Sequence, residues 1–237
     1  TKYGQGEIYA TTLINKLSCL LVNKLASMDP FGCGIEMEAD KPNWFDALNG
    51  LPALFGSSIC ETFELKRLCI LLKEAIKKTN VDKIYISEEI YNFLIDLNNL
   101  IKEYLRDCPR KGTVPKVDYQ YWDKSYSLKE DYRQKVRFGF SGKELEIETS
   151  GLMTILDNAL HKINRGLDKA LDKKRNIYYT YFINEAKEFE VIKEHFVKPL
   201  KFIQRKLPFF LEGQMHALRL AKNTNGAKTL YKATKSS

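Results

Sequence analysis

The residues best suited to chemistry lie in one stretch, Glu36 to Ser58, which holds four acids, one tryptophan, two prolines and two glycines. Trp44 stands two residues before Asp46, so in an extended segment the two side chains point to the same side. A sugar site needs an aromatic ring to stack on the pyranose and a carboxylic acid to protonate the glycosidic oxygen. We therefore interpret residues 36–58 as a functional loop that binds and cleaves a sugar.

A structural interpretation of the same two residues stays open. Trp44 would then anchor the core, and Asp46 would cap a turn before Ala47. Residue types and spacing alone do not separate this interpretation from the catalytic one.

The central residues of this stretch resemble a known motif. Trp44-Phe45-Asp46-Ala47-Leu48-Asn49 is similar to the Trp-Asn-Asp-x-x-Asn motif of inverting disaccharide phosphorylases of the cellobiose phosphorylase type. The longer string KPNWFDALNGLPALFGSS, preceded by GIEMEA, resembles a long-chain branch of that family. Weaker likenesses lie toward both ends of the chain: Gly4–Thr12 and Val197–Leu220, with FLEG at Phe210–Gly213 and HALRL at His216–Leu220.

The resemblance implies a fold and a set of roles. The fold is mainly α, part of an (α/α) toroid or barrel with long functional loops and a small β or extended segment, and residues 1–237 form part of one catalytic domain. Asp46 takes the place of the general acid and Trp44 lies against the sugar ring. Lys41, Asn43 and Asn49 are expected to bind substrate. Asn43 and Phe45 depart from the family's usual Asp and Asn, and both reshape the sugar subsite.

The implied reaction needs a single carboxyl group and no cofactor. Inorganic phosphate, as co-substrate, replaces the water and the base of an inverting hydrolase, and cationic or N–H donors hold it. To act as an acid, Asp46 needs a raised pKa, which burial, Glu36, Glu38 or phosphate would supply. The family's phosphate pocket uses a histidine and a Gly/Ser-rich loop beyond the motif, and we find no such loop here. The chain is therefore expected to be an inactive fragment of a longer parent.

Two other functions remain open. One is a carbohydrate-binding or structural α/α domain without catalysis, which the departures at Asn43 and Phe45 favour. The other is an inverting hydrolase with a second carboxylate, such as Glu38 or Glu61, opposite Asp46.

Composition narrows the class of protein. With 44% hydrophobic and 29% charged residues among 237, the chain is globular and not disordered. Five cysteines without a CxxC pair indicate reduced thiols in a cytoplasmic protein and no metal site. Lys193 to Ser237 holds ten Lys and Arg against two acids, which we interpret as a solvated surface and not as a nucleic-acid site. Neither a membrane span nor a signal peptide is expected, and a homodimer of the parent stays open.

Hydrophobic spacing predicts the secondary structure. Helices are expected over residues 8–26, 58–78, 88–105, 152–174 and 213–221, with a short one over 127–137. The inward face of the first helix is expected to include Ala10, Leu13, Leu21 and Leu25. Ser87 is expected to cap the third helix, whose inward face includes Ile90, Phe93, Leu94 and Leu97. The aromatic stretch 177–192 is predicted as a strand pair or an extended segment. Cys19, Cys60 and Cys69 fall on or near apolar faces and should be buried.

Overall fold

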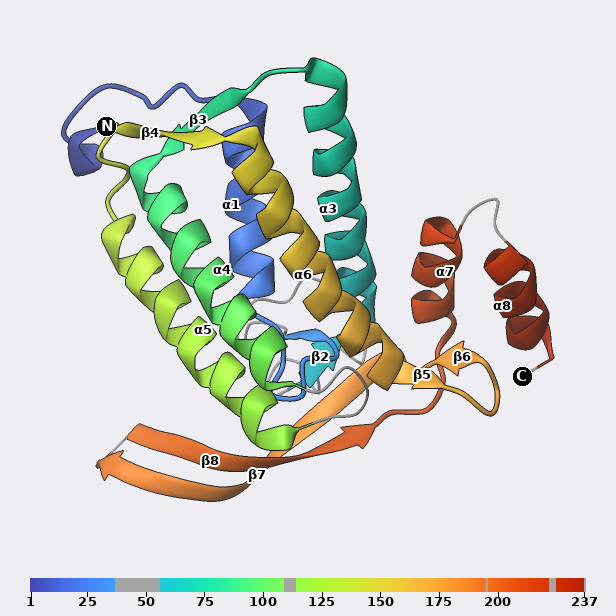
Figure 1. Ribbon diagram of the computed structural model, residues 1–237. Helices are drawn as coiled ribbons and strands as arrows, with labels where there is room; N and C mark the ends of the chain where they lie inside the picture. The colour runs from blue at the N-terminus through green and yellow to red at the C-terminus, as the bar shows by residue number, and fades with distance from the viewer. Residues whose placement is uncertain (37–55, 109–113, 195, 222–224, 237) are drawn as a thin grey trace. The chain divides into compact units, whose positions relative to one another are not determined.

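The computed structural model describes residues 1–36, 56–108, 114–194, 196–221 and 225–236 (Figure 1). Helices dominate this part of the chain, with some antiparallel sheet, which confirms the prediction of a mainly α protein. The chain divides into two compact units, Thr1–Ser27 with Leu65–Lys162 and Met28–Glu64 with Ile163–Ser237. Among the described residues, no helix combines the length and the apolar character needed to cross a membrane.

The first unit is mainly helical. Its elements are η1 (Lys2–Gly4), α1 (Leu13–Leu25), most of α3 (Ile59–Thr79), β3 (Lys83–Ser87), α4 (Glu88–Asp107), α5 (Pro115–Lys135), β4 (Glu144–Glu148) and most of α6 (Thr149–Ala170). Helices α4 and α5 lie side by side, and α1 packs on α4 (Figure 1). Strands β3 and β4 pair antiparallel, with Tyr85 opposite Glu146.

Helix α4 follows its sequence pattern closely. The predicted inward residues Ile90, Phe93, Leu94 and Leu97 are all buried. Apolar side chains at three- and four-residue steps form one face, which explains why this helix was predictable. Ser87 precedes the helix as expected, but its hydroxyl makes no capping hydrogen bond.

Helix α5 corrects the sequence prediction, which placed only a short helix over residues 127–137. The helix runs from Pro115 to Lys135 and has proline in its first turn, where no backbone N–H is needed. Its buried residues keep helical spacing but are largely polar: Asp118, Tyr121, Ser125, Lys129 and Tyr132. Because this inward face mixes hydroxyl and charged groups, hydrophobic periodicity does not reveal it.

The polar face of α5 has partners within the first unit. The Tyr121 hydroxyl donates to the Leu25 carbonyl at 3.1 Å, and the Ser125 hydroxyl donates to the Ala26 carbonyl at 3.3 Å. These bonds satisfy carbonyl groups at the end of α1, which have no partner inside that helix. The buried ammonium of Lys162 lies 3.7 Å from the centre of the Tyr104 ring and 4.0 Å from that of Tyr121.

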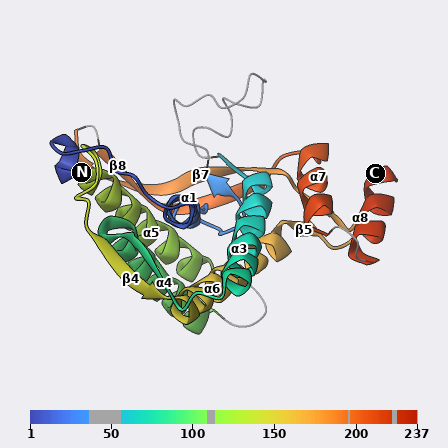
Figure 2. The same cartoon turned by 90° about the horizontal axis from the view of Figure 1, so that it is seen from above.

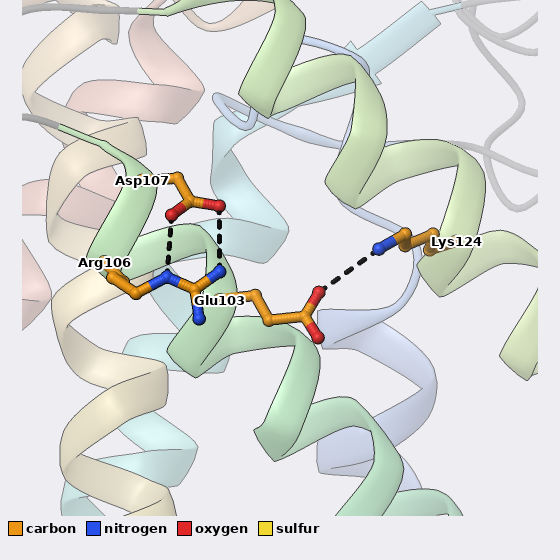
Figure 3. Close-up of polar contacts among 4 residues, drawn as sticks. All are labelled: Glu103, Arg106, Asp107 and Lys124. Atoms are coloured by element: carbon orange, nitrogen blue, oxygen red, sulfur yellow. Dashed lines mark hydrogen bonds and ion pairs between the residues drawn. The ribbon is translucent and has the colours of Figure 1, made fainter.

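Exposed ion pairs also form on helices α4 and α5. Lys124 of α5 donates to Glu103 of α4 at 3.2 Å, and Arg106 makes two bonds to its neighbour Asp107 (Figure 3). Solvent screening makes such pairs worth about 0–1 kcal/mol each. The buried contacts between α4 and α5 therefore carry most of their association.

Helix α1 is shorter than predicted. It starts at Leu13 and not at Ile8, because the Thr12 hydroxyl accepts from Asn15 N at 3.4 Å and caps the helix. Leu21 and Leu25 are buried as expected, whereas the predicted inward residue Leu13 is 73% exposed. Ala10, also predicted inward, lies before the helix and is exposed.

The second unit contains the main sheet. Strands β1 (Ile35–Glu36), β2 (Gly56–Ser58), β7 (Tyr181–Lys193) and β8 (Phe196–Lys206) form an antiparallel sheet in the order β1-β2-β7-β8. A short hairpin joins β5 (Leu171–Asp172) to β6 (Ile177–Tyr178), and helices α7 (Leu211–Leu220) and α8 (Asn225–Lys235) follow. Helices α7 and α8 lie side by side in both views (Figures 1 and 2).

Several sequence predictions concern elements of the second unit. The extended segment predicted over 177–192 is confirmed as β6 and β7, whereas β8 and α8 were not expected. Helix α6 ends at Ala170, short of the predicted residue 174, because Leu171 and Asp172 pair with β6. Helix α3 begins where expected, with the Ser58 hydroxyl accepting from Cys60 N at 3.1 Å. Cys60 and Cys69 are buried, while Cys19 is only half-buried.

Candidate functional site

The residues predicted to bind and cleave a sugar are Lys41, Asn43, Trp44, Asp46 and Asn49, and all five lie outside the described residues. Glu38 lies outside them as well. The structure describes the chain on either side of this segment. Of the other acids considered, Glu36 lies in β1 and Glu61 lies in the first turn of α3.

The two flanks of residues 37–55 are paired strands. Ile35 of β1 lies opposite Ser58 of β2, and Glu36 lies opposite Ser57. Strand β2 also pairs with β7, with Ser57 opposite Phe182, so both flanks belong to the main sheet of the second unit. Since antiparallel partners are about 5 Å apart, Glu36 and Ser57, on either side of residues 37–55, lie next to each other in the sheet.

A buried carboxylate reinforces this pairing. Asp29, which is fully buried, accepts five hydrogen bonds from described residues and links both flanks to β8. The donors are Phe31 N (2.9 Å) and Cys33 N (3.0 Å) to Oδ1, and Gly34 N (3.0 Å), Ser57 Oγ (2.5 Å) and Gln204 Nε2 (3.2 Å) to Oδ2. Backbone N–H groups and hydroxyls aimed at one carboxylate form a rigid frame. No local sequence pattern predicts a functional role for Asp29.

Close packing supports the same frame. A Cβ atom on Gly34 would lie 2.7 Å from the Ser57 hydroxyl and 2.9 Å from Ser58 N, so only glycine lets the two flanks approach this closely. The Thr62 hydroxyl donates to the Cys33 carbonyl at 3.1 Å and ties α3 to the first flank.

A second group of polar side chains lies where the start of α3 meets α7. Cys60 of α3 and Glu212 and His216 of α7 each offer a potential metal-ligand atom, and the three atoms lie within 4.8 Å of one another. His216 Nδ1 contacts Glu64 Oε1 at 2.7 Å, and the Tyr181 hydroxyl donates to Glu212 Oε2. We call Cys60, Glu212 and His216 the α3–α7 cluster.

The thiol of this cluster is not an activated nucleophile. Burial raises the pKa of Cys60 from 9.0 to about 12, and the negative charge of Glu212 adds to this rise, against a hydrogen bond with Ser58 that lowers it. Thiolates are the reactive form of cysteine. Without a bound cation, Cys60 is therefore a neutral thiol at physiological pH.

A hollow of about 190 Å³ lies in the first unit, lined mainly by polar residues that include Glu88, Glu89, Asp96 and Asp131. Glu89 is buried and accepts from Ser141 N at 2.7 Å, while Glu88 pairs with Lys143 at 2.6 Å. The hollow is smaller than the roughly 300–1,000 Å³ usual for small-molecule sites. We do not assign it a ligand.

No family model matches the chain, and a search of curated proteins finds no match. Function must therefore be inferred from the motif, its structural frame and the α3–α7 cluster. No sequence pattern predicted this cluster, because Cys60 lies on α3 and the other two members lie on α7, far along the chain; 152 positions also separate His216 from its hydrogen-bond partner Glu64. The only local signal is the four-residue step from Glu212 to His216, which puts both on one face of a helix.

Proposed function

We propose that this chain is the acid-bearing part of an inverting glycoside phosphorylase. Its parent would cleave a β-glucoside such as cellobiose with inorganic phosphate and release a sugar 1-phosphate. The observation that carries the proposal is the motif Trp44-Phe45-Asp46-Ala47-Leu48-Asn49. Further support comes from the flanks of the motif segment, which β1–β2 pairing and the Asp29 carboxylate hold at adjacent positions of one sheet.

In this proposal Asp46 is the only catalytic carboxyl group. It protonates the glycosidic oxygen while phosphate attacks the anomeric carbon from the opposite face, so the configuration inverts. Trp44 stacks on the sugar ring, and Lys41, Asn43 and Asn49 bind its hydroxyl groups. No cofactor is required, because phosphate is already an anionic nucleophile.

The remaining expectations form part of the same proposal. The helices belong to an (α/α) toroid that the parent chain completes, and the parent supplies the phosphate-binding loop. The protein works in the cytoplasm, which its five free cysteines support, and its partners are an oligosaccharide or disaccharide and phosphate, not nucleic acid or a membrane.

The departures at Asn43 and Phe45 favour one competitor, a carbohydrate-binding α/α domain without catalysis. Binding and catalysis can be separated in two experiments. The first uses the 237-residue chain with Trp122→Phe, which leaves Trp44 as its single tryptophan. A change in Trp44 fluorescence on adding cellobiose is expected under both functions, and its absence contradicts both.

The second experiment assays the natural polypeptide that contains this sequence. Incubation with cellobiose should release glucose 1-phosphate only when phosphate is present, and Asp46→Asn should lower the rate by about 10²–10⁴-fold. Asp40→Asn, a charge change in the same segment, is the matched control. Sugar release without phosphate would indicate a hydrolase, and sugar binding without any release would indicate a binding domain.

A further inference from the structure

The start of α3 and helix α7, both in the second unit, bring three metal-ligand side chains together. Cys60 lies in the first turn of α3, whereas Glu212 and His216 lie one turn apart on α7. Their potential ligand atoms are all within 4.8 Å of one another, close enough for a single ion to reach all three. Cys60 is buried, and Glu212 and His216 are half-buried, so the cluster lies at the edge of the core with access to solvent.

The chemistry of these donors selects a class of ligand. Thiolate sulfur, imidazole nitrogen and carboxylate oxygen suit zinc and related transition metals, whereas calcium and magnesium prefer oxygen ligands alone. We propose that Cys60, Glu212 and His216 bind a divalent cation of the zinc class. Three protein ligands leave the fourth tetrahedral position to water. This proposal does not depend on the phosphorylase function.

The contacts around the ligands fit this role. Glu64 Oε1 lies 2.7 Å from His216 Nδ1, so the other ring nitrogen, Nε2, is the one left to bind the cation. A carboxylate bonded to the second ring nitrogen is the usual outer partner of a metal-binding histidine. The Tyr181 hydroxyl donates to Glu212 Oε2 and orients that carboxylate in the same way.

The starts of both helices are fixed by one residue. Ile59 N, at the first position of α3, donates to the Thr180 carbonyl at 3.1 Å. The Thr180 hydroxyl donates to the carbonyl of Phe210, the residue before α7, at 2.7 Å. A Cβ atom on Gly213 would lie 2.6 Å from Thr180 Oγ1, so a glycine is needed for this approach of α7. Preorganised ligands of this kind lower the cost of binding an ion.

Cys60 would bind a divalent ion as a thiolate, which requires loss of the thiol proton. The alternative is a polar cluster held by hydrogen bonds alone, with Cys60 as a core thiol. Only in the metal site does the Cys60 sulfur form a bond to added metal.

Cobalt is the probe that separates these arrangements, because a cobalt–thiolate bond gives a near-ultraviolet charge-transfer band. The metal-stripped 237-residue chain is titrated with Co²⁺, and Zn²⁺ is then added in competition. We expect one equivalent of Co²⁺ to produce the band and Zn²⁺ to abolish it. A folded chain that shows no band overturns the proposal.

Matched variants locate the ligands. Cys60→Ser should abolish the band, whereas Cys69→Ser, which changes a buried thiol on the same helix outside the cluster, should keep it. Glu64→Gln should weaken Zn²⁺ binding by about 10–100-fold and keep the band. His216→Gln, at a side chain with 19% exposure, tests the site without opening the core and should weaken binding by more than about 100-fold. A band lost only in Cys69→Ser, or unchanged affinity in His216→Gln, overturns the assignment.

Discussion

The Ser57 hydroxyl donates a 2.5 Å hydrogen bond to Oδ2 of Asp29 and so joins the chain segments on either side of residues 37–55. The same carboxylate accepts from three backbone N–H groups and from Gln204. Asp29 is thus the common acceptor for described residues on both sides of this segment.

Replacing Asp29 should destabilise the protein strongly. Asp29→Ala leaves buried donors without an acceptor, which costs about 3–5 kcal/mol of unfolding free energy. Urea unfolding followed by circular dichroism measures the loss. Asp157→Ala is the control, because Asp157 is an exposed carboxylate and its pair with Lys73 should be worth less than about 1 kcal/mol. Equal losses in the two variants would contradict this account of Asp29.

Two glycines of helix α6 should respond in opposite directions to alanine. A Cβ atom on Gly166 would collide with the carbonyl oxygen of Gly32, so Gly166→Ala should cost about 1–3 kcal/mol of stability. A Cβ atom on Gly151 meets nothing within 4 Å, and alanine there should add about 0.5–1 kcal/mol. Thermal unfolding of both variants checks the pair, and a stabilised Gly166→Ala would refute the close approach.

Stability should fall at alkaline pH. Burial raises the pKa of the Cys69 thiol from 9.0 to about 12, and it raises the pKa of the Tyr121 hydroxyl above its ordinary 10.0. Both pKa values are higher in the folded state than in the unfolded state. The two groups therefore contribute fully to the free energy of unfolding below about pH 9, and this contribution is lost as pH rises toward 12. Urea unfolding across this range should show the decline, and Cys69→Ala should make it shallower. If Cys69→Ala leaves the decline of the unfolding free energy with pH unchanged, the predicted contribution of the Cys69 thiol is wrong.

The five cysteines should differ in reactivity. Cys19 is half-buried, whereas Cys33, Cys60, Cys69 and Cys108 are at most 7% exposed. A colorimetric thiol reagent should therefore react quickly with one thiol in the folded chain and with five after unfolding without reductant. Cys19→Ser should remove the fast reaction. Three or fewer thiols in the unfolded chain would contradict the assignment of five free cysteines.

The role of Trp44 can be decided by separating binding from stability. If the ring contacts sugar, Trp44→Ala should weaken cellobiose binding and change the unfolding free energy little. If the ring is a core anchor, the variant should lose about 3–5 kcal/mol of stability. Calorimetric titration and urea unfolding measure the two quantities. Trp122→Ala, which removes a ring that packs near Tyr119 and Tyr126 of α5, is the control and should leave sugar binding intact.

The sequence alone predicted the elements whose buried faces are apolar. Helix α4 is the clearest case, since Phe93, Leu94 and Leu97 mark its inward side with local helical spacing. Helix α6 was predicted for the same reason, although its end depended on pairing between β5 and β6. The motif around Asp46 is also a property of the sequence, because it is recognised from residue identity and order.

Tertiary structure decided what depends on residues far apart in the chain. The pairing of Glu36 with Ser57, and of both flanks with the main sheet, follows from long-range hydrogen bonds that no local pattern encodes. The length of α5 could not be predicted from hydrophobic spacing, because its buried side carries Asp118, Ser125 and Lys129. The α3–α7 cluster likewise exists only in the folded chain, where Thr180 fixes the starts of both helices and so brings Cys60 to His216.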